Sequence, residues 1–118
     1  MPQTVSIWKA SVRGLGERHL AQGYPAEDFP GRPFGNGKAY FAADRELAAQ
    51  YASPDIGAYE DFVIEIAIPV EDYERTFRKF ETPLATSEGV FNELPIPTSL
   101  LETLNGYPRT RRPAPARP

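Results

Sequence analysis

Residues 35–51 read Gly-Asn-Gly-Lys-Ala-Tyr-Phe-Ala-Ala-Asp-Arg-Glu-Leu-Ala-Ala-Gln-Tyr, a stretch that predicts a loop, a strand, a cap and a helix in succession. Its two glycines permit sharp backbone turns at low steric cost. The aromatic pair Tyr40-Phe41 suits a strand. Asp44 stands where an N-cap is expected, because its carboxylate can accept a backbone N–H that lacks a helical partner. Arg45 to Ala52 then has the composition and apolar spacing of a helix.

This stretch places one tyrosine, Tyr40, on the strand and another, Tyr51, on the following helix. Two tyrosines so arranged can face each other across a flat ring, which would make them a ligand-binding pair. The alternative interpretation is that both are half-buried core residues, which is a common place for tyrosine. The residues themselves do not choose between these interpretations.

The composition is that of one soluble domain, with 118 residues, 41% hydrophobic residues and 25% charged residues. The sequence contains no cysteine, which excludes disulfides and thiolate chemistry. It contains one histidine, His19, which argues against a histidine-based metal site and against a Ser-His-Asp triad. The spacing of the acidic residues does not resemble a calcium loop, so we expect no metal.

The net charge of −3 is unevenly distributed. Four of the 13 basic residues lie in the last ten positions, so the rest of the chain has nine basic residues against 16 acidic ones, or about −7. An acidic body makes nucleic-acid binding an unlikely role, since such binding needs a cationic face. The sequence shows neither an apolar run near ~20 residues, which a membrane helix requires, nor a signal peptide at its start. We therefore expect no membrane partner and a cytoplasmic location, in the producing or the target cell.

The strand signals are short and mixed with helical ones, which favours an α+β fold over a doubly wound sheet. The clearest strand pattern covers Asp61–Val70, where large apolar residues at every second position give one apolar face. Val5–Ala10 is a second predicted strand. Val90–Pro97 is a third, in which Pro95 and Pro97 remove ladder donors, as at a sheet edge.

The remaining segments have weaker signals. We expect a helix of one or two turns within Glu17–Gly23, a short helix or irregular crossing at Glu71–Phe80, a polar loop at Thr82–Gly89 and a helix from Thr98 or Ser99 to Leu104. Three prolines make Tyr24–Phe34 a loop, long enough to serve as a lid or binding loop. Ser53–Gly57 should end the central helix, because Pro54 cannot continue it. The domain is predicted to occupy residues 1–106, with a disordered Pro/Arg-rich tail at 107–118.

Glu93 is the acidic residue with the most unusual surroundings. It lies between apolar residues and two prolines on a predicted extended segment, so its backbone is restricted. A carboxylate on a stiff segment is suited to stabilising a developing positive charge. The alternative is an outward-facing strand residue without a chemical role.

These features together resemble the ADP-ribosyltransferase fold, and specifically its diphtheria-toxin-like branch. That family has three ordered motifs: a first strand with an aromatic residue and histidine, a strand–helix pair with Tyr-x10-Tyr, and a later strand with a catalytic glutamate. Tyr40 to Tyr51 match the second motif in tyrosine spacing, in the aspartate at the cap and in the Ala-Ala that precedes the second tyrosine. Ile7–Ser11 align with the first motif, and Glu93 stands where the third is expected. The resemblance spans roughly residues 4–104.

Two departures from the family pattern bear on the predicted site. Lys9 replaces the family's histidine, where the related arginine-type branch has arginine, and the Ser-Thr-Ser element of that branch is missing. Phe91, two positions before Glu93, replaces the usual Glu or Gln, so the acceptor is not indicated.

The resemblance implies a small split β-sandwich with short flanking helices. It also implies that NAD is the substrate. Tyr40 and Tyr51 would hold the nicotinamide ring, and Glu93 would be catalytic. Lys9 would contact the adenylate ribose or a phosphate of NAD, with Ser11 beside it on the first motif and Arg13 as the fallback cation.

The function that the resemblance implies is NAD-dependent mono-ADP-ribosyl transfer by a bacterial or phage toxin or effector, as a glycosyltransferase-class enzyme. The acceptor would be a macromolecule, in first place a protein, and an immunity protein is a further expected partner. Two alternatives remain open: a catalytically inactive binding module on the same fold, or a related reaction such as NAD hydrolysis or RNA 2′-phosphate transfer. For the implied transferase function, the small size of the chain predicts a minimal catalytic domain or a part of a larger toxin.

Overall fold

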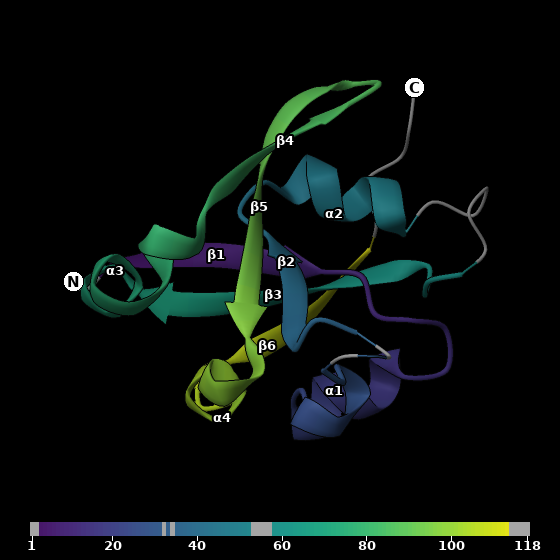
Figure 1. Cartoon of the computed structure of the whole chain (residues 1–118), viewed down its shortest axis with the longest axis horizontal. Coiled ribbons are helices and arrows are strands. Elements are labelled where there is room, and N and C mark those ends of the chain that lie inside the picture. The colour runs from purple at the N-terminus through teal and green to yellow at the C-terminus, as the bar shows by residue number, and fades with distance from the viewer. Residues whose placement is uncertain (1–2, 32, 34, 53–57, 114–118) are drawn as a thin grey trace.

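The structure is a computed structural model that describes residues 3–31, 33, 35–52 and 58–113, in which an antiparallel sheet forms the centre (Figure 1). The spatial order of its strands is β4-β5-β2-β1-β3-β6, and every neighbouring pair is antiparallel. In chain order the strands are β1 (Thr4–Lys9), β2 (Lys38–Ala42), β3 (Phe62–Pro69), β4 (Thr82–Thr86), β5 (Gly89–Pro97) and β6 (Arg109–Pro113). The predicted α+β class is confirmed at this level.

The helices are short and lie around the sheet rather than between successive parallel strands. They are α1 (Gly16–Gln22), η1 (Ala26–Asp28), α2 (Arg45–Tyr51), α3 (Val70–Asp72), η2 (Tyr73–Phe77), η3 (Arg78–Phe80), η4 (Thr98–Leu100) and α4 (Leu101–Leu104). The segments α3, η2 and η3 follow one another without a break, so the predicted crossing after β3 is helical, with changing pitch. The predicted helix end at Ser53–Gly57 lies outside the described residues.

Apolar side chains are buried on both faces of the sheet. The alternating face of β3 predicted from sequence is in the larger cluster, where Ile64, Ile66 and Ile68 are fully buried. Val63 points to the other face and packs with Ala42 and the α2 residues Leu47 and Ala48 in a smaller cluster. Helix α2 thus covers the second face, and the smaller cluster fixes its position against the strands.

The sheet is nearly divided between β1 and β2. Within the described residues these strands pair at one position, Trp8 opposite Ala42, whereas β1 pairs with β3 at six positions and β2 with β5 at five. Beyond that pair the described residues show no further pairing of β1 with β2, and the Tyr40 backbone oxygen of β2 accepts from the Lys9 side chain instead. The separation creates the space in which the candidate site lies.

The polar loop predicted at Thr82–Gly89 is wrong. Residues 82–86 form β4, which makes a hairpin with the first half of β5. Strand β4 lies at the edge of the sheet and is exposed or half-buried along its length, so it has no apolar alternation by which it could be recognised. The register begins with Thr82 opposite Glu93, so Pro95 and Pro97 lie beyond the end of β4. Because β4 does not extend alongside these two prolines, the prediction that they lie at a sheet edge is correct for this end of β5.

The prediction of a disordered tail from residue 107 is also wrong for the described part of that segment. Residues 109–113 form β6, which pairs with β3. The Arg111 guanidinium lies 4.0 Å from the centre of the Phe62 ring, and Arg112 Nε donates to Glu65 at 2.8 Å. An edge strand needs only one neighbour and contributes nothing to the core, so composition alone missed it. Residues 114–118 of the predicted tail lie outside the described residues.

Candidate functional site

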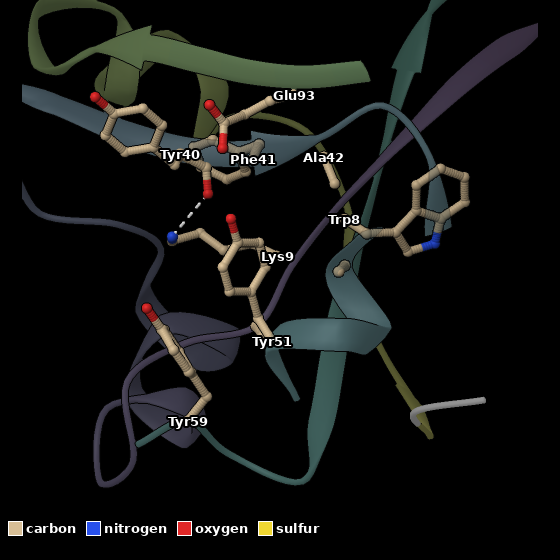
Figure 2. A pocket seen from close by; sticks show the side chains of 10 residues that line it. Trp8, Lys9, Tyr40, Phe41, Ala42, Tyr51, Tyr59 and Glu93 are labelled. Atoms are coloured by element: carbon tan, nitrogen blue, oxygen red, sulfur yellow. Dashed lines mark hydrogen bonds between the residues drawn. The ribbon is translucent and has the colours of Figure 1, made fainter. Parts of the chain in front are cut away.

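A pocket of about 280 Å³ opens where β1 and β2 separate (Figure 2). Four of the residues predicted from sequence line it: Lys9 of β1, Tyr40 of β2, Tyr51 of α2 and Glu93 of β5. These residues come from four elements and are up to 84 positions apart in the sequence. The rest of the wall consists of three aromatic side chains and three alanines, and the size is near the lower end for small-molecule sites.

Lys9 crosses the gap between the two halves of the sheet. Its Nζ donates to the backbone oxygen of Tyr40 at 2.9 Å, which gives that oxygen a partner where the ladder is interrupted. The same nitrogen lies 5.3 Å from the centre of the Phe29 ring and 5.4 Å from that of Phe41. Burial lowers the Lys9 pKa to about 8, although the negative charge of Glu93 opposes this shift. A cation held between aromatic rings and a neutral carbonyl has lost much of its hydration.

Glu93 lies opposite Ala42 in the pairing of β5 with β2, so its side chain is on the α2 side of the sheet. The side chain is half-buried and lines the pocket, which contradicts the simple outward-facing interpretation. Burial raises the pKa of the Glu93 carboxyl, while the Tyr51 hydroxyl and the positive charge of Lys9 act in the opposite direction. The pocket therefore holds one acid and one amine, each less ready to be charged than in water.

The two tyrosines meet the pocket in different ways. Tyr40 is 42% exposed at its rim, and its hydroxyl accepts a hydrogen bond from the Asn36 side chain. Tyr51 is half-buried against the smaller cluster, with its ring edge-on to Tyr59 at a centroid distance of 5.6 Å. Burial, with the nearby charge of Glu93, raises the Tyr51 pKa, so its hydroxyl remains a donor at neutral pH. The alternative interpretation, in which both tyrosines are half-buried core residues, therefore fits Tyr51 in part and does not fit Tyr40.

Asp44 positions α2 in a way that sequence did not predict. Its backbone is extended, as at an N-cap, but its side chain caps no helical N–H. The carboxylate instead accepts the backbone N–H of Asn92 at 2.7 Å, and the neighbouring Ala43 N–H donates to the Asn92 oxygen at 3.0 Å. These bonds fasten the start of α2 to β5 immediately beside Glu93. The prediction of a capping side chain is therefore wrong, because a strand distant in sequence supplies a competing donor.

Ser11 and Arg13, the other predicted contacts to NAD, do not line the pocket. Ser11 is 1% exposed, and its hydroxyl is paired with His19. Arg13 is exposed beyond the end of β1, where its backbone N–H donates to Ala58. After Lys9 the chain stays paired with the segment before β3, with Val12 bridged to Tyr59, and Arg13 lies outside the pocket, so the fallback role given to Arg13 has no geometric basis.

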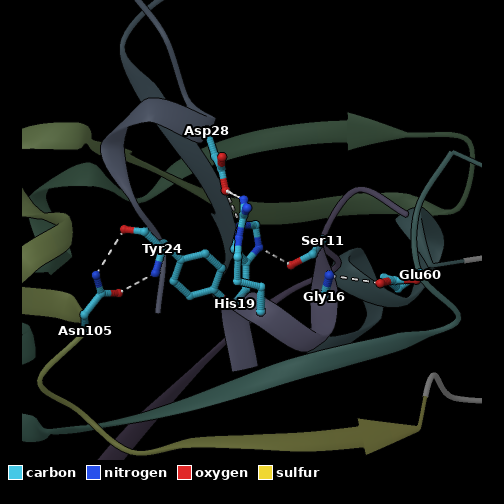
Figure 3. A network of polar contacts seen from close by, with 8 residues as sticks. Ser11, Gly16, His19, Tyr24, Asp28, Glu60 and Asn105 are labelled. Atoms are coloured by element: carbon cyan, nitrogen blue, oxygen red, sulfur yellow. Dashed lines mark hydrogen bonds and ion pairs between the residues drawn. The ribbon is translucent and has the colours of Figure 1, made fainter. Parts of the chain in front are cut away.

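The serine–histidine–aspartate arrangement that the single histidine argued against is nevertheless present (Figure 3). Ser11 Oγ lies 2.8 Å from His19 Nδ1, and His19 Nε2 lies 2.8 Å from Asp28 Oδ2. The Asp28 pKa is lowered: burial raises it, but hydrogen bonds from His19 and Arg18 outweigh that effect. Asp28 is therefore an ionised acceptor, His19 carries its proton on Nε2, and Nδ1 accepts from Ser11. Because Ser11 is buried, this chain of bonds fastens η1 to α1 and to the end of β1 instead of forming a hydrolytic site.

Sequence reasoning missed four aromatic residues at the site, one of which is Phe41, beside Tyr40 on β2. Trp8 and Tyr59 line the pocket, and Phe29 lies over the Lys9 ammonium. Trp8 is the neighbour of Lys9 on β1 and is the single tryptophan of the sequence, which was a usable signal. Tyr59 and Phe29 belong to connecting segments without periodicity, so their positions depend on tertiary packing alone.

Comparisons with known protein families, curated proteins and solved structures found no match. In the described residues, no cluster of three or more His, Asp or Glu side chains is suited to hold a metal ion. In the same part of the chain, no helix is long and apolar enough to cross a membrane.

Proposed function

We propose that this chain is an NAD-dependent mono-ADP-ribosyltransferase that releases nicotinamide and transfers ADP-ribose to a macromolecular acceptor. The observation that carries the proposal is the convergence of Tyr40, Tyr51 and Glu93 in one pocket. The sequence resemblance alone singles out these three residues, since it depends on their order and spacing in the chain. A chance selection of two tyrosines and one of 16 acids would seldom meet in one small cavity.

The pocket chemistry suits the nicotinamide end of NAD. Aromatic faces attract a cationic ring, and the aromatic walls match a flat occupant. Glu93 would hold the hydroxyls of the nicotinamide ribose and stabilise the oxocarbenium-like transition state as nicotinamide leaves. Such a charge, placed where positive charge develops, contributes about 3–4 kcal/mol by analogy with one oxyanion-hole donor. The pocket volume of about 280 Å³ accommodates this end, and the adenylate part would lie outside it.

The division of the sheet supports the finer fold assignment, a small split β-sandwich of the ADP-ribosyltransferase type over residues 1–106. The halves β4-β5-β2 and β1-β3-β6 meet at one residue pair, and the proposed site lies at that junction. Strand β6 extends the second half, so the fold unit would include residues 109–113 as well.

Lys9 would take the place of the family histidine at this junction. In the unliganded pocket its Nζ is bound to the Tyr40 carbonyl, 2.9 Å away. When NAD binds, the ammonium would exchange this bond for the adenylate ribose or a phosphate. Lysine offers a point charge rather than a planar donor, so it gives less directional recognition than arginine.

The test is release of nicotinamide from NAD by the purified chain, with and without cell lysate. Release that requires lysate supports transfer, and labelled NAD would then identify the acceptor, which we propose to be a protein. Release without lysate would replace transfer by NAD hydrolysis. Tight NAD binding without release under either condition would leave the inactive binding module, and absence of binding would refute the proposal.

The matched control for the catalytic residue is another Glu→Gln change. Glu93→Gln removes the proposed charge with little change in shape, whereas Glu102→Gln makes the same change on the exposed side of α4. The proposal requires that only the first variant lose nicotinamide release. If the acceptor is a cytosolic protein of a target cell, expression of the wild-type chain should be toxic there, and an immunity protein would suppress this effect.

A further inference from the structure

Lys9 has an environment that differs from that of the other two lysines in the sequence. Lys38 and Lys79 are exposed, whereas Lys9 is half-buried and lines the pocket, and its Nζ lies over the rings of Phe29 and Phe41. Its hydrogen bond goes to the neutral carbonyl of Tyr40, and the ion pairs of the described residues do not include it. Lysine acts as a nucleophile where its amine lacks a tight carboxylate partner and is partly removed from water, and half-buried Lys9 meets both conditions.

We propose that the pocket is a covalent binding site for neutral aromatic aldehydes, which Lys9 Nζ captures as an imine. This inference does not depend on NAD being a substrate. It rests on an amine and a carboxyl group that line one small cavity with aromatic walls.

The lining selects the ligand class. Trp8, Tyr40, Tyr51 and Tyr59 provide flat apolar surfaces for a ring. Glu93 would repel a carboxylate or phosphate on the ligand. The positive charge of Lys9 could offset this repulsion, but the nitrogen of the neutral imine product no longer carries that charge. A volume of about 280 Å³ limits the ligand to one ring with small substituents. A neutral aromatic aldehyde satisfies all three conditions.

The bond changes balance without an oxidant or a reductant. The lone pair of neutral Lys9 Nζ attacks the carbonyl carbon, a C–N bond forms, and the oxygen takes the electron pair of the C=O π bond. One of the two nitrogen protons then moves to this oxygen, which yields a carbinolamine with one N–H. The Glu93 carboxyl group protonates its hydroxyl, the C–O bond breaks and water leaves. The nitrogen loses its remaining proton to the Glu93 carboxylate, which restores the acid and leaves a C=N bond.

Two pKa shifts favour these steps. The Lys9 pKa of about 8 gives a large neutral fraction near pH 8, where an ordinary lysine is almost entirely protonated. Burial raises the pKa of Glu93, so at a given pH a larger fraction of it carries the proton that the step requires than for a carboxyl group in water. Lowered basicity reduces the intrinsic nucleophilicity of the amine, so the gain in rate is smaller than the gain in neutral fraction.

The experiment is reductive trapping on the intact folded chain. Benzaldehyde and cyanoborohydride are added at pH 6–9, and the labelled positions are quantified by peptide mass spectrometry. We expect Lys9 to be labelled about tenfold faster than Lys38 or Lys79, with half of the maximal rate near pH 8. Benzoate at the same concentration should not slow the labelling, since the pocket should reject an anion. Glu93→Gln should slow labelling of Lys9 and leave that of Lys38 and Lys79 unchanged.

The outcome that overturns the proposal is labelling of Lys9 at or below the rate of the exposed lysines. The proposal would also be overturned if Lys9 were labelled with the same selectivity in the urea-unfolded chain. The reactivity of Lys9 would then come from its sequence neighbours and not from the folded pocket. Lys9→Arg should abolish the label at this position, with Lys38→Arg as the matched control for folding and handling. Since no NAD is present in these reactions, they test the aldehyde site independently of the proposed transferase activity. Either proposal can be refuted while the other is confirmed.

Discussion

The carboxylate of Asp44 accepts the backbone N–H of Asn92 at 2.7 Å, across 48 positions of sequence. This bond joins the first residue before α2 to the residue before Glu93. Helix α2 carries Tyr51 at its other end, so the bond fixes the distance between the proposed stacking ring and the proposed catalytic acid. One hydrogen bond between residues outside the pocket therefore holds together the helix that carries Tyr51 and the strand that carries Glu93.

Asp44→Ala should lower the free energy of unfolding by about 1.5–3 kcal/mol, the usual value for a hydrogen bond to a charged group that leaves its donor unsatisfied. It should also weaken NAD binding, because α2 loses its attachment to β5. Thermal unfolding and NAD titration measure the two effects. Glu46→Ala, on the exposed first turn of the same helix, is the matched control and should change neither. An unaltered Tm in Asp44→Ala would mean that this bond does not anchor the helix.

Glu93→Gln should stabilise the chain at neutral pH, although it removes the proposed activity. The folded pKa of Glu93 is raised, so ionisation costs the folded state free energy at pH values above the folded pKa. Below the ordinary carboxyl pKa both states are protonated and this cost disappears. The gain in Tm over wild type should therefore be present at pH 7 and vanish towards pH 3.5. An equal gain at both pH values would show that charge is not its origin.

Tyr51 should contribute to the proposed NAD site through its ring and through its hydroxyl separately. Tyr51→Phe keeps the ring and should leave NAD affinity nearly unchanged while lowering turnover, because the hydroxyl faces the Glu93 carboxylate. Tyr51→Ala should weaken binding by about tenfold, the value of a stacking contact near 1–1.5 kcal/mol. Calorimetric titration with NAD distinguishes the two variants. Full affinity in Tyr51→Ala would refute the stacking role.

Acid should weaken the fold through His19 before the carboxylates titrate. Burial lowers the His19 pKa more than Asp28 raises it, so the neutral form is favoured in the folded state. Stability is complete above the ordinary pKa of 6.5 and is lost as pH falls through 6.5 towards the lowered folded value. We expect the wild-type Tm to fall between pH 7 and pH 5. His19→Gln should remove this slope, even if its Tm is lower throughout; a slope that persisted would assign the effect to another group.

Deletion of residues 109–118 should destabilise the chain, in contrast to what the composition of this segment suggests. The deletion removes β6 and the two hydrogen bonds of Arg109 to the carbonyls of Leu20 and Asn105. A loss of about 2–4 kcal/mol corresponds to a Tm lower by roughly 10–20 °C for a domain of this size. Deletion of 114–118 alone is the control and should have little effect. Equal Tm values for both deletions would show that β6 adds no stability.

The sequence by itself determined the features that depend on near neighbours. The apolar alternation of β3, the strand–helix stretch that carries Tyr40 and Tyr51, and the extended backbone around Glu93 follow from side-chain periodicity and from the φ restriction of proline, which act within a few residues. The α+β class follows from the mixture of these elements.

Tertiary structure alone decided which of these side chains meet. Lys9 reaches the pocket because β1 and β2 separate after a single pair, and Ser11, two residues later, is buried against His19 instead. Strand β6 and the bond of Asp44 to Asn92 likewise depend on partners 43 or more positions away. Such contacts form only when the fold brings distant donors, acceptors and rings together, and no local pattern encodes which partner will be the nearest.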